Sequence, residues 1–372
     1  MTRPEDPSRR LLALSVALVL CNFLAGLSFI PYPGIQNDEA VFAWGVYDPG
    51  YAISQLSVFK YRIPMMLISY LGALKSWAYA PILAVWEASV WSVRLPVLAI
   101  GALTIWLLCW LVYRIAGARA ALAGCALLAF DTTYLLTTVY DWGPVALQHL
   151  LMVGGVLSLV RFHQGASERS LAVAFLLFGL ALWDKTLFVW TLVAIVVAGV
   201  LLFWRPIRAS VNRKTVVLAL ISFSIGAFPL LRYNVQKRGE TWRRNVAWSR
   251  DELASKTQVL RSSLDGSGLF GYIAVDEPTA NSREPRTPIE RASVALSEFA
   301  GHPQKGPLPY LVIAAILLLP FLWRTPARKP ALFAVITTML VWVQMAFTKG
   351  AGAAVHHTAL LWPWPHMLVG VA

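Results

Sequence analysis

The sequence has few charged residues and few cysteines. Both shortages limit the classes of protein to which the chain can belong. Only 14% of the 372 residues are charged, against an average of about 25% in soluble domains. The cysteines, Cys21, Cys109 and Cys125, lie inside apolar runs and show no metal-ligand spacing. The sequence therefore suggests neither a disulfide framework nor a zinc site.

Apolar residues take the place of the missing charges. The chain is 58% hydrophobic and contains 16 Trp, with a mean hydropathy of +0.60. This composition is typical of a polytopic membrane protein. The net charge of +13 comes from short clusters of Lys and Arg between apolar runs. Such clusters indicate membrane topology and contact with lipids, so we expect membrane lipids and no nucleic acid as partners.

Apolar runs long enough to cross a bilayer predict about ten transmembrane helices in an all-α fold. The first run follows Arg9 and Arg10, and we interpret it as a retained span because no clear cleavage site precedes "PYPG". The stretch 61–90 is less apolar and contains Pro64 and Pro81, so it predicts interfacial helices. The expected spans lie near residues 11–30, 92–113, 118–137, 144–160, 169–183, 186–204, 215–232, 308–323, 330–347 and 355–372.

The basic clusters predict how these spans are oriented. With a cytoplasmic N-terminus, every second loop is basic, as cytoplasmic loops usually are. The opposite loops contain "NDEA", "VYDWGP", "WDK" and "TKGAGAAVHH", together with the long segment 233–307. Loops this long escape the charge rule, and the segment has the composition of a solvated loop or a small cap. Acidic, amide and imidazole groups thus collect on the extracytoplasmic face.

Three carboxylates at this face are candidates for chemistry. Asp38 and Glu39 follow the first span, and Asp141 in "YDWGP" lies between the third and fourth spans. Adjacent side chains diverge, so we expect one of Asp38 and Glu39 to face a pocket and the other a structural partner or a cation. A purely structural alternative stays open, in which Asp38 only caps the helix that starts at "EAVFAWG".

These residues resemble a family of membrane enzymes. The order of "NDEA" after the first span, Arg94 to Pro96 in "SVRLP", and Asp141 in "YDWGP" resembles the GT-C membrane glycosyltransferases. Among them it is most similar to the protein O-mannosyltransferase and aminoarabinose-transferase branch, glycosyltransferase family 39 in the broad sense. The resemblance is specific over about residues 10–160. It implies GT-C architecture and transfer of a sugar, with inversion, from a polyprenyl-phosphate donor to an acceptor on the extracytoplasmic face of the cell (inner) membrane.

The resemblance also implies roles for the carboxylates. Asp38 would be the general base that takes the proton of the attacking acceptor group. Glu39 and Asp141 would orient that base, bind the acceptor or hold a divalent cation. A phosphate leaves as an anion, so the reaction needs positive charge near it more than a second acid.

Candidates for that positive charge are Lys60 and Arg62 in "VFKYRIP", Lys185, Arg232, and the pair His356 and His357. For Lys185 the favoured interpretation is snorkelling to head groups, with Asp184 as a partner. For Arg232 a lipid contact and a phosphate contact stay equally open. A zinc site at the His pair is disfavoured because no third ligand lies nearby in sequence.

Two further His residues and two further Asp residues lie within apolar runs. His149 and His366 are interpreted as hydrogen-bonded core residues. Asp131 and Asp184 bear on the rival function, a transporter or flippase of polyprenyl-linked sugars, which would require them on a continuous polar path. A third possibility is a structural assembly subunit. It does not explain why Asp38, Glu39 and Asp141 lie at the same face.

The sequence and the resemblance together predict three parts. Residues 1–232 form a transmembrane module whose first outer loop, 31–90, carries the catalytic residues. Residues 233–307 form the extracytoplasmic loop or cap, and 308–372 form C-terminal transmembrane helices. The chain ends at Ala372 inside an apolar run, whereas proteins of the resembled family usually continue, so we expect a short or truncated form.

Overall fold

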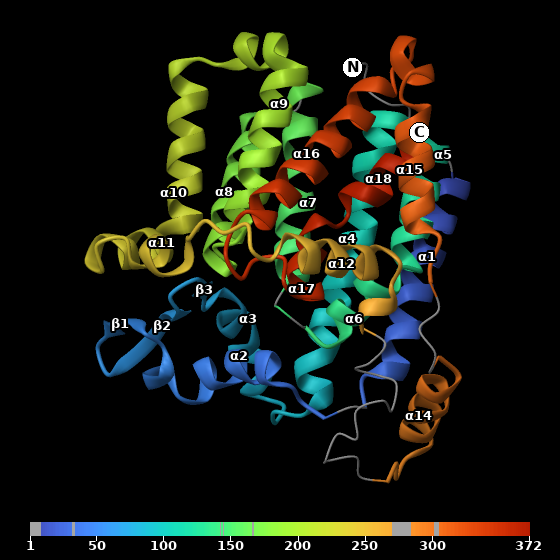
Figure 1. Ribbon diagram of the computed structural model, residues 1–372. Coiled ribbons are helices and arrows are strands. Elements are labelled where there is room, and N and C mark those ends of the chain that lie inside the picture. Colours follow the sequence, from blue (N-terminus) through green and yellow to red (C-terminus); the bar gives the residue numbers. More distant parts are fainter. Residues whose placement is uncertain are drawn as a thin grey trace.

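A computed structural model shows a bundle of upright helices with a smaller mixed layer at one end (Figure 1). The described residues are mostly helical, as predicted. The structure describes residues 9–31, 34–141, 143, 145–165, 167–269, 284–300 and 305–372.

Six of the described helices are long and apolar enough to span a membrane. A seventh span results if α5 (Ala118–Ala129) and α6 (Thr132–Val139), which meet at 60°, are counted as one. The chain is therefore an integral membrane protein, but the predicted number of about ten spans is not confirmed. The six helices are α1 (Arg9–Phe29), α4 (Val90–Ala116), α7 (Ala146–His163), α9 (Phe188–Ser210), α10 (Arg213–Gln236) and α16 (Arg328–Ala346).

The remaining predicted spans are shorter or interrupted. Helix α8 (Glu168–Asp184) has 17 residues, and α15 (Leu308–Leu318) has 11 and ends before Pro320. The predicted span 355–372 is divided into α17 (Val355–Thr358), a 3₁₀ turn at Ala359–Leu361 and α18 (Trp364–Val371). Its interruption coincides with Pro363, which cannot donate a backbone hydrogen bond. The segment is buried in the bundle, with Trp362 and Trp364 fully inaccessible to solvent.

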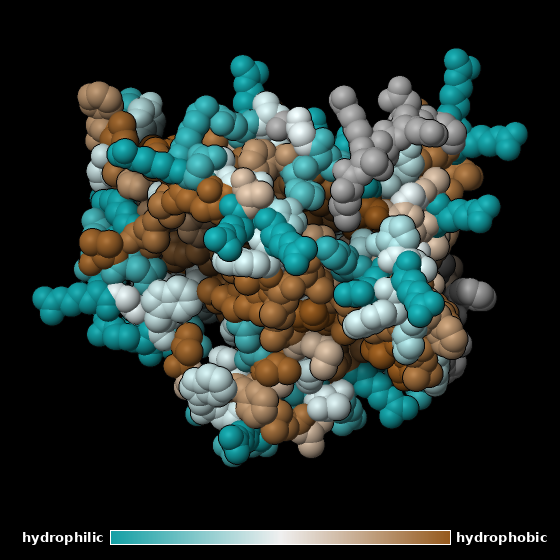
Figure 2. Space-filling model, turned by 90° about the horizontal axis from the view of Figure 1, so that it is seen from above, coloured by the Kyte–Doolittle hydropathy of each residue, from teal (hydrophilic) through white to brown (hydrophobic). Residues whose placement is uncertain are grey.

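The two sets of predicted loops lie at opposite ends of the bundle. Figure 1 shows the N-terminal end of α1 and the α9–α10 connection at the top, and the first outer loop at the bottom. Figure 2, which views the top end, shows hydrophilic side chains projecting around an apolar centre. The loops rich in Arg and Lys therefore share one end, as the alternation predicts. That this end faces the cytoplasm stays a prediction.

The first outer loop differs from the predicted interfacial helices. It contains α2 (Asn37–Tyr47), a 3₁₀ turn at Pro49–Tyr51 and helix α3 (Leu74–Leu83). Between them lies an antiparallel sheet in the order β1-β2-β3. The strands are β1 (Ser54–Val58), β2 (Tyr61–Ile68) and β3 (Leu71–Gly72). The helical prediction for 61–72 was wrong because "YRIPMMLI" combines aromatic and β-branched residues, which favour strands, with Pro64, which disfavours a helix interior.

The long segment after α10 covers the end of the bundle that carries the first outer loop. It contains α11 (Glu240–Asn245), α12 (Leu253–Leu264), a 3₁₀ turn at Ser267–Leu269 and α14 (Pro288–Ala300). Residues 270–283 and 301–304 of the predicted cap lie outside the described residues. The division into three parts at 232 and 307 stays a prediction.

Lys256 fastens this segment to the bundle. Its ammonium group is fully buried and donates to the carbonyl oxygens of Met345, Ala346 and Thr348 at 3.4, 3.2 and 2.7 Å. These carbonyls lie at and just beyond the C-terminal end of α16, where backbone oxygens lack helical donors and the helix dipole is negative. The ammonium group of Lys256 on α12 therefore caps the C-terminal end of α16.

Helices α8 and α10 approach closely at a pair of glycines. A methyl group on Gly179 would lie 2.3 Å from the carbonyl oxygen of Phe223, and one on Gly226 would lie 2.4 Å from that of Leu176. Small residues permit such close crossings in membranes, where helix association depends on packing more than on the hydrophobic effect.

We expect Gly179→Ala to destabilise the protein by about 1–3 kcal/mol, because the added methyl group meets backbone and must push the helices apart. Gly199→Ala in α9 is the matched control, since the nearest atom to its methyl group would lie 3.9 Å away. Thermal unfolding in detergent should show a lower midpoint for the first variant and no loss for the second. Equal midpoints would show that the α8–α10 crossing tolerates separation.

Candidate active site

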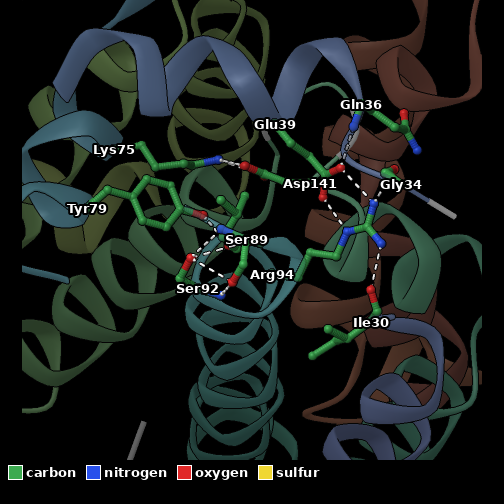
Figure 3. Close-up of polar contacts among 11 residues, drawn as sticks. Ile30, Gly34, Gln36, Glu39, Lys75, Tyr79, Ser89, Ser92, Arg94 and Asp141 are labelled. Atoms are coloured by element: carbon green, nitrogen blue, oxygen red, sulfur yellow. Dashed lines mark hydrogen bonds and ion pairs between the residues drawn. The ribbon is translucent and has the colours of Figure 1, made fainter. Parts of the chain in front are cut away.

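Glu39 forms a closed, buried ion pair with Arg94. Helix α2 begins at Asn37, and the Glu39 side chain accepts a hydrogen bond from the Gln36 backbone N–H at 2.8 Å, as in a capping box. Arg94 in α4 donates from Nε to Oε1 at 2.6 Å and from Nη2 to Oε2 at 2.8 Å (Figure 3). Both side chains are fully buried. Each oxygen of Glu39 thus has a charged donor.

The Arg94 guanidinium extends this pair to two further segments. It donates to the carbonyl oxygens of Ile30 at 2.7 Å and Gly34 at 2.9 Å, and it lies 4.7 Å from the centre of the Tyr140 ring. One planar cation therefore joins the end of α1, the start of α2, α4 and the end of α6. Of the two adjacent carboxylates, Glu39 is the one with a structural partner.

Asp141 forms a second buried ion pair, with Lys75 of α3. Lys75 Nζ lies 2.7 Å from Oδ1 and 2.5 Å from Oδ2 of Asp141, and both residues are buried (Figure 3). Asp141 takes a left-handed backbone conformation with φ of 46° just after α6. Burial raises the pKa of the Asp141 carboxyl to about 6, and the Lys75 ammonium opposes that rise. The pair holds Asp141 against α3 just after the end of α6.

A cavity of about 530 Å³ lies between the first outer loop and the C-terminal part of the chain. Asp38 enters it from α2, Lys185 from the α8–α9 connection, and His356 and His357 from α17. Tyr51, Tyr70 and Trp190 supply aromatic walls, and Asn245, Thr348 and Lys349 supply polar ones. Of the three predicted carboxylates, only Asp38 lines this cavity.

Gly143 connects two of the charged groups in the cavity, Asp38 and Lys185. Its backbone N–H donates to Asp38 Oδ2 at 3.0 Å, and its carbonyl oxygen accepts a hydrogen bond from Lys185 Nζ. Its φ of 72° lies in the region that favours glycine, and a methyl group here would lie 2.5 Å from Cβ of His356. Gly143 thus sets the separation of an anion and a cation. Asp38 is thereby bonded to the segment that follows Asp141, but Asp141 itself does not line the cavity.

Lys185 does not snorkel, which corrects the interpretation made from sequence. The side chain is 3% exposed, faces the cavity and bonds to Gly143. Burial lowers the pKa of Lys185 to about 8, while the Asp38 carboxylate raises it in opposition. Asp184 is not its hydrogen-bond partner, because neither Asp184 oxygen has a donor among the described residues.

Of the other basic residues predicted to bind phosphate, some line the cavity and some do not. His356 and His357 lie side by side in the cavity, with ring centres 4.3 Å apart. Lys60 and Arg62 are exposed near the tip of the β1–β2 hairpin, and Arg232 donates to the carbonyl oxygen of Gln55 at 3.4 Å. Because these three residues do not line the cavity, a direct contact with a ligand there is not supported for them.

The carboxylates do not fit a divalent cation. The oxygens of Glu39 are taken by Arg94 and those of Asp141 by Lys75, which leaves Asp38 as a single carboxylate. Within the described ranges no three His, Cys, Asp or Glu side chains are grouped as metal ligands. We therefore derive no metal-dependent step for this site.

The buried His residues and Asp131 form structural contacts. His149 Nε2 lies 2.8 Å from the carbonyl oxygen of Ala359, and His366 Nε2 lies 3.2 Å from Asp131 Oδ2. Asp131 also accepts from the backbone N–H of Tyr134 at 2.6 Å and from Trp362 Nε1 at 3.0 Å. The prediction that His149 and His366 are hydrogen-bonded core residues is confirmed.

Sequence reasoning missed Lys75 and Gly143 as parts of this region. Lys75 was the only charge within the apolar stretch "LGALKSWAYAPIL", and a buried lysine there requires a carboxylate partner. That signal was available. The role of Gly143 depends on backbone conformation at a turn, which no residue pattern in the chain encodes by itself.

Comparison with known proteins agrees with the resemblance noted in the sequence. Residues 72–231 match the family model described as dolichyl-phosphate-mannose-protein mannosyltransferase. The predicted likeness to GT-C glycosyltransferases is confirmed by this match. No curated protein sequence matches significantly.

Two solved structures align with this chain. ArnT from Cupriavidus metallidurans bound to undecaprenyl phosphate aligns with a TM-score of 0.48 and 15% identity, over 98% of this chain and 77% of that one. The oligosaccharyltransferase of Archaeoglobus fulgidus, in its apo form, aligns with a TM-score of 0.48 and 14% identity, over 97% of this chain and 50% of that one.

We expect Lys75→Met to destabilise the protein by about 3–5 kcal/mol, because Asp141 would be left as a buried charge without a partner. The double variant Lys75→Met with Asp141→Asn should recover part of that loss, since the unpaired charge is gone. The matched control is Lys214→Met, which breaks an exposed pair with Glu168 and should cost about 0–1 kcal/mol. Chemical unfolding in detergent measures all three. Equal losses at the two lysines would contradict the importance of the buried pair.

Proposed function

We propose that this chain, which matches the dolichyl-phosphate-mannose-protein mannosyltransferase model over residues 72–231, transfers a sugar from a polyprenyl-phosphate donor. The acceptor is a hydroxyl or amine, and the reaction inverts the anomeric carbon at the extracytoplasmic end of the bundle. The observation that carries the proposal is a single cavity in which the Asp38 carboxylate faces buried and half-buried basic groups.

Asp38 is the proposed general base. Gly143 N–H engages Oδ2, and among the described residues Oδ1 has no hydrogen-bond donor. One oxygen is thus oriented by the backbone while the other is available to take the proton of the acceptor as it attacks. The adjacent Glu39 cannot take this role in the same arrangement, because Arg94 holds both of its oxygens.

The basic groups of the cavity are the proposed binding site for the donor phosphate. Lys185 is buried and Lys349 is exposed on the wall formed by the last part of the chain, and these two supply positive charge. Burial lowers the pKa of His356 and His357 on the same wall to about 3, so their imidazoles offer hydrogen bonds without a charge. A phosphate that leaves as an anion is stabilised by preorganised donors and positive charge. The bond from Lys185 to Gly143 holds the ammonium in place before a ligand arrives.

The aromatic and apolar walls suit the other parts of such a donor. Tyr51, Tyr70 and Trp190 provide faces on which a sugar ring can stack. Leu187 and Trp190 lie at the start of α9, whose residues Val193, Val196 and Val200 are exposed on the outside of the bundle. A lipid chain lying along α9 would therefore bring its phosphate to the cavity without leaving the membrane.

A transporter of the same lipids has less support. It would need Asp131 and Asp184 on one polar path, but Asp131 is occupied by three donors from α6 and the C-terminal segment. Asp184, which is buried without a donor among the described residues, is then left as the single feature in its favour.

Replacing the proposed base should remove most turnover. We expect Asp38→Asn to lower the transfer rate by about 10²- to 10⁴-fold, the usual contribution of general base catalysis. The assay follows radiolabel from a panel of polyprenyl-phosphate sugars to membrane acceptors. Asp48→Asn is the control, since Asp48 is exposed in the same loop and does not line the cavity. Undiminished turnover in the Asp38 variant would falsify the role given to this residue.

Gly143→Ala should reduce turnover while the protein stays folded. The methyl group would collide with His356 and shift the N–H that orients Asp38. A displacement of about 1 Å costs on the order of 100-fold in rate. Gly117→Ala is the control, because Gly117 also has a positive φ but its methyl group would meet open space. If both variants lose activity equally, backbone strain rather than the orientation of Asp38 explains the effect.

A further inference from the structure

The tip of the β1–β2 hairpin exposes apolar and basic side chains together. Val58 pairs with Tyr61, so Phe59 and Lys60 form a two-residue turn. Phe59 is fully exposed and Tyr61 is 64% exposed, while Lys60 and Arg62 are exposed beside them. Water-facing hairpin tips usually carry Gly, Asn or Asp. A Phe at this point therefore needs an explanation other than turn formation.

The backbone conformation of Phe59 is also unfavourable for a residue with a side chain. Its φ of 53° lies in the left-handed region, which costs a non-glycine residue on the order of 1 kcal/mol or more. Because the ring is fully exposed, no packing within the described protein offsets this cost. An apolar surface outside the protein would offset it.

A second cluster of the same composition lies on the same side of the molecule as the hairpin (Figure 1). Residues at the end of α10 and in α11 are exposed and basic, and Trp242 is 41% exposed among them. Glu240 is the acid of this stretch and is paired with Arg244 at 2.9 Å. With the hairpin tip, this cluster forms what we call the interfacial patch: Phe59, Lys60, Tyr61, Arg62, Lys237, Arg238, Trp242, Arg243 and Arg244.

Hydrogen bonds attach the sheet that carries the hairpin to α10 and α11. Arg232 of α10 bonds to Gln55 in β1, and Thr241 Oγ1 of α11 donates to the carbonyl oxygen of Ser69 at 2.6 Å. Figure 1 shows the hairpin and α11 projecting to the same side, beyond the lower end of α10. The outer face of α10 is apolar down to its last turn, where Val235 is 81% exposed.

We propose that the interfacial patch binds the membrane surface, with the Phe59 and Trp242 rings in the interface and the basic side chains on anionic lipid head groups. Three features support this occupant over a protein partner. The patch is continuous with the lipid-facing side of α10, it combines aromatic rings with basic groups as interfacial segments do, and it carries a large uncompensated positive charge. It lies outside the cavity, so the inference does not depend on the proposed transfer reaction.

The patch also gives Lys60 and Arg62 a use other than contact with the donor in the cavity. Both flank the hairpin tip, and Lys60 Nζ lies 5.4 Å from the centre of the Tyr61 ring. The ammonium of Lys60 thus lies over the Tyr61 ring, a cation–π contact that keeps the basic and the aromatic group together. The hairpin would thus hold the first outer loop against the bilayer at the side where α10 ends.

The test measures how deep the hairpin tip lies in a bilayer. Phe59→Cys is made in full-length protein with Cys21→Ser, because Cys21 is the exposed native cysteine. The new thiol carries a polarity-sensitive fluorophore, and the protein is placed in nanodiscs of phosphatidylcholine alone or mixed with phosphatidylglycerol. The control label is at Asp48→Cys, exposed in the same outer loop but outside the patch.

We expect iodide to quench the label at position 59 several-fold less than the label at position 48, with blue-shifted emission, in nanodiscs that contain phosphatidylglycerol. Equal quenching at both positions would overturn the proposal. The second measurement adds Lys60→Gln and Arg62→Gln to the labelled protein, and the extra protection given by phosphatidylglycerol should disappear. Protection that is identical in both lipids and unchanged by these substitutions would refute the binding of anionic head groups.

Discussion

The buried Glu39–Arg94 ion pair is the constraint on which the arrangement of the site depends. A carboxylate and a guanidinium without solvent are stable together only if every oxygen and N–H finds a partner. Arg94 meets this demand by reaching Ile30, Gly34 and Glu39 at once. The first residues after α1 are therefore drawn onto α4, and the start of α2 is fixed. Because Asp38 precedes Glu39, its direction into the cavity follows from this anchor.

The charged groups near the cavity are of two kinds. Some form buried ion pairs, and others face the cavity. Glu39 with Arg94 and Asp141 with Lys75 are buried ion pairs, and in each pair both carboxylate oxygens accept a hydrogen bond from the cation. Asp38 and Lys185 instead share Gly143 and keep a side directed to the cavity. A backbone amide offers weaker attraction than an opposite charge, so these two groups are oriented without being neutralised by each other. Such a division keeps an anion and a cation on the cavity wall, each bonded to the same glycine.

Local signals predicted the helical membrane class, the divergence of Asp38 and Glu39, and the core positions of His149 and His366. These depend on apolar run length and on the direction of neighbouring side chains, which a sequence contains. The sheet at 54–72 was missed because a helical prediction was extended across Pro64. Lys185 was misassigned because its environment is built by Gly143 and Asp38, which are distant in sequence. The interrupted segment 355–372 follows from tertiary burial, which hydropathy does not distinguish from a lipid environment.

The ammonium of Lys256 on the end of α16 is one of several contacts that link the covering segment to the C-terminal part of the chain. The carbonyls it holds belong to residues 345–348, and the chain runs from there into Lys349, Gly350 and Ala351 of the cavity wall. A neighbouring strand-like contact, in which Lys349 donates to Ala247 at 2.7 Å, reinforces the link. A displacement of α12 would therefore shift the wall beside Lys349 through these hydrogen bonds. The covering segment and this wall of the cavity are thus one connected unit of the fold.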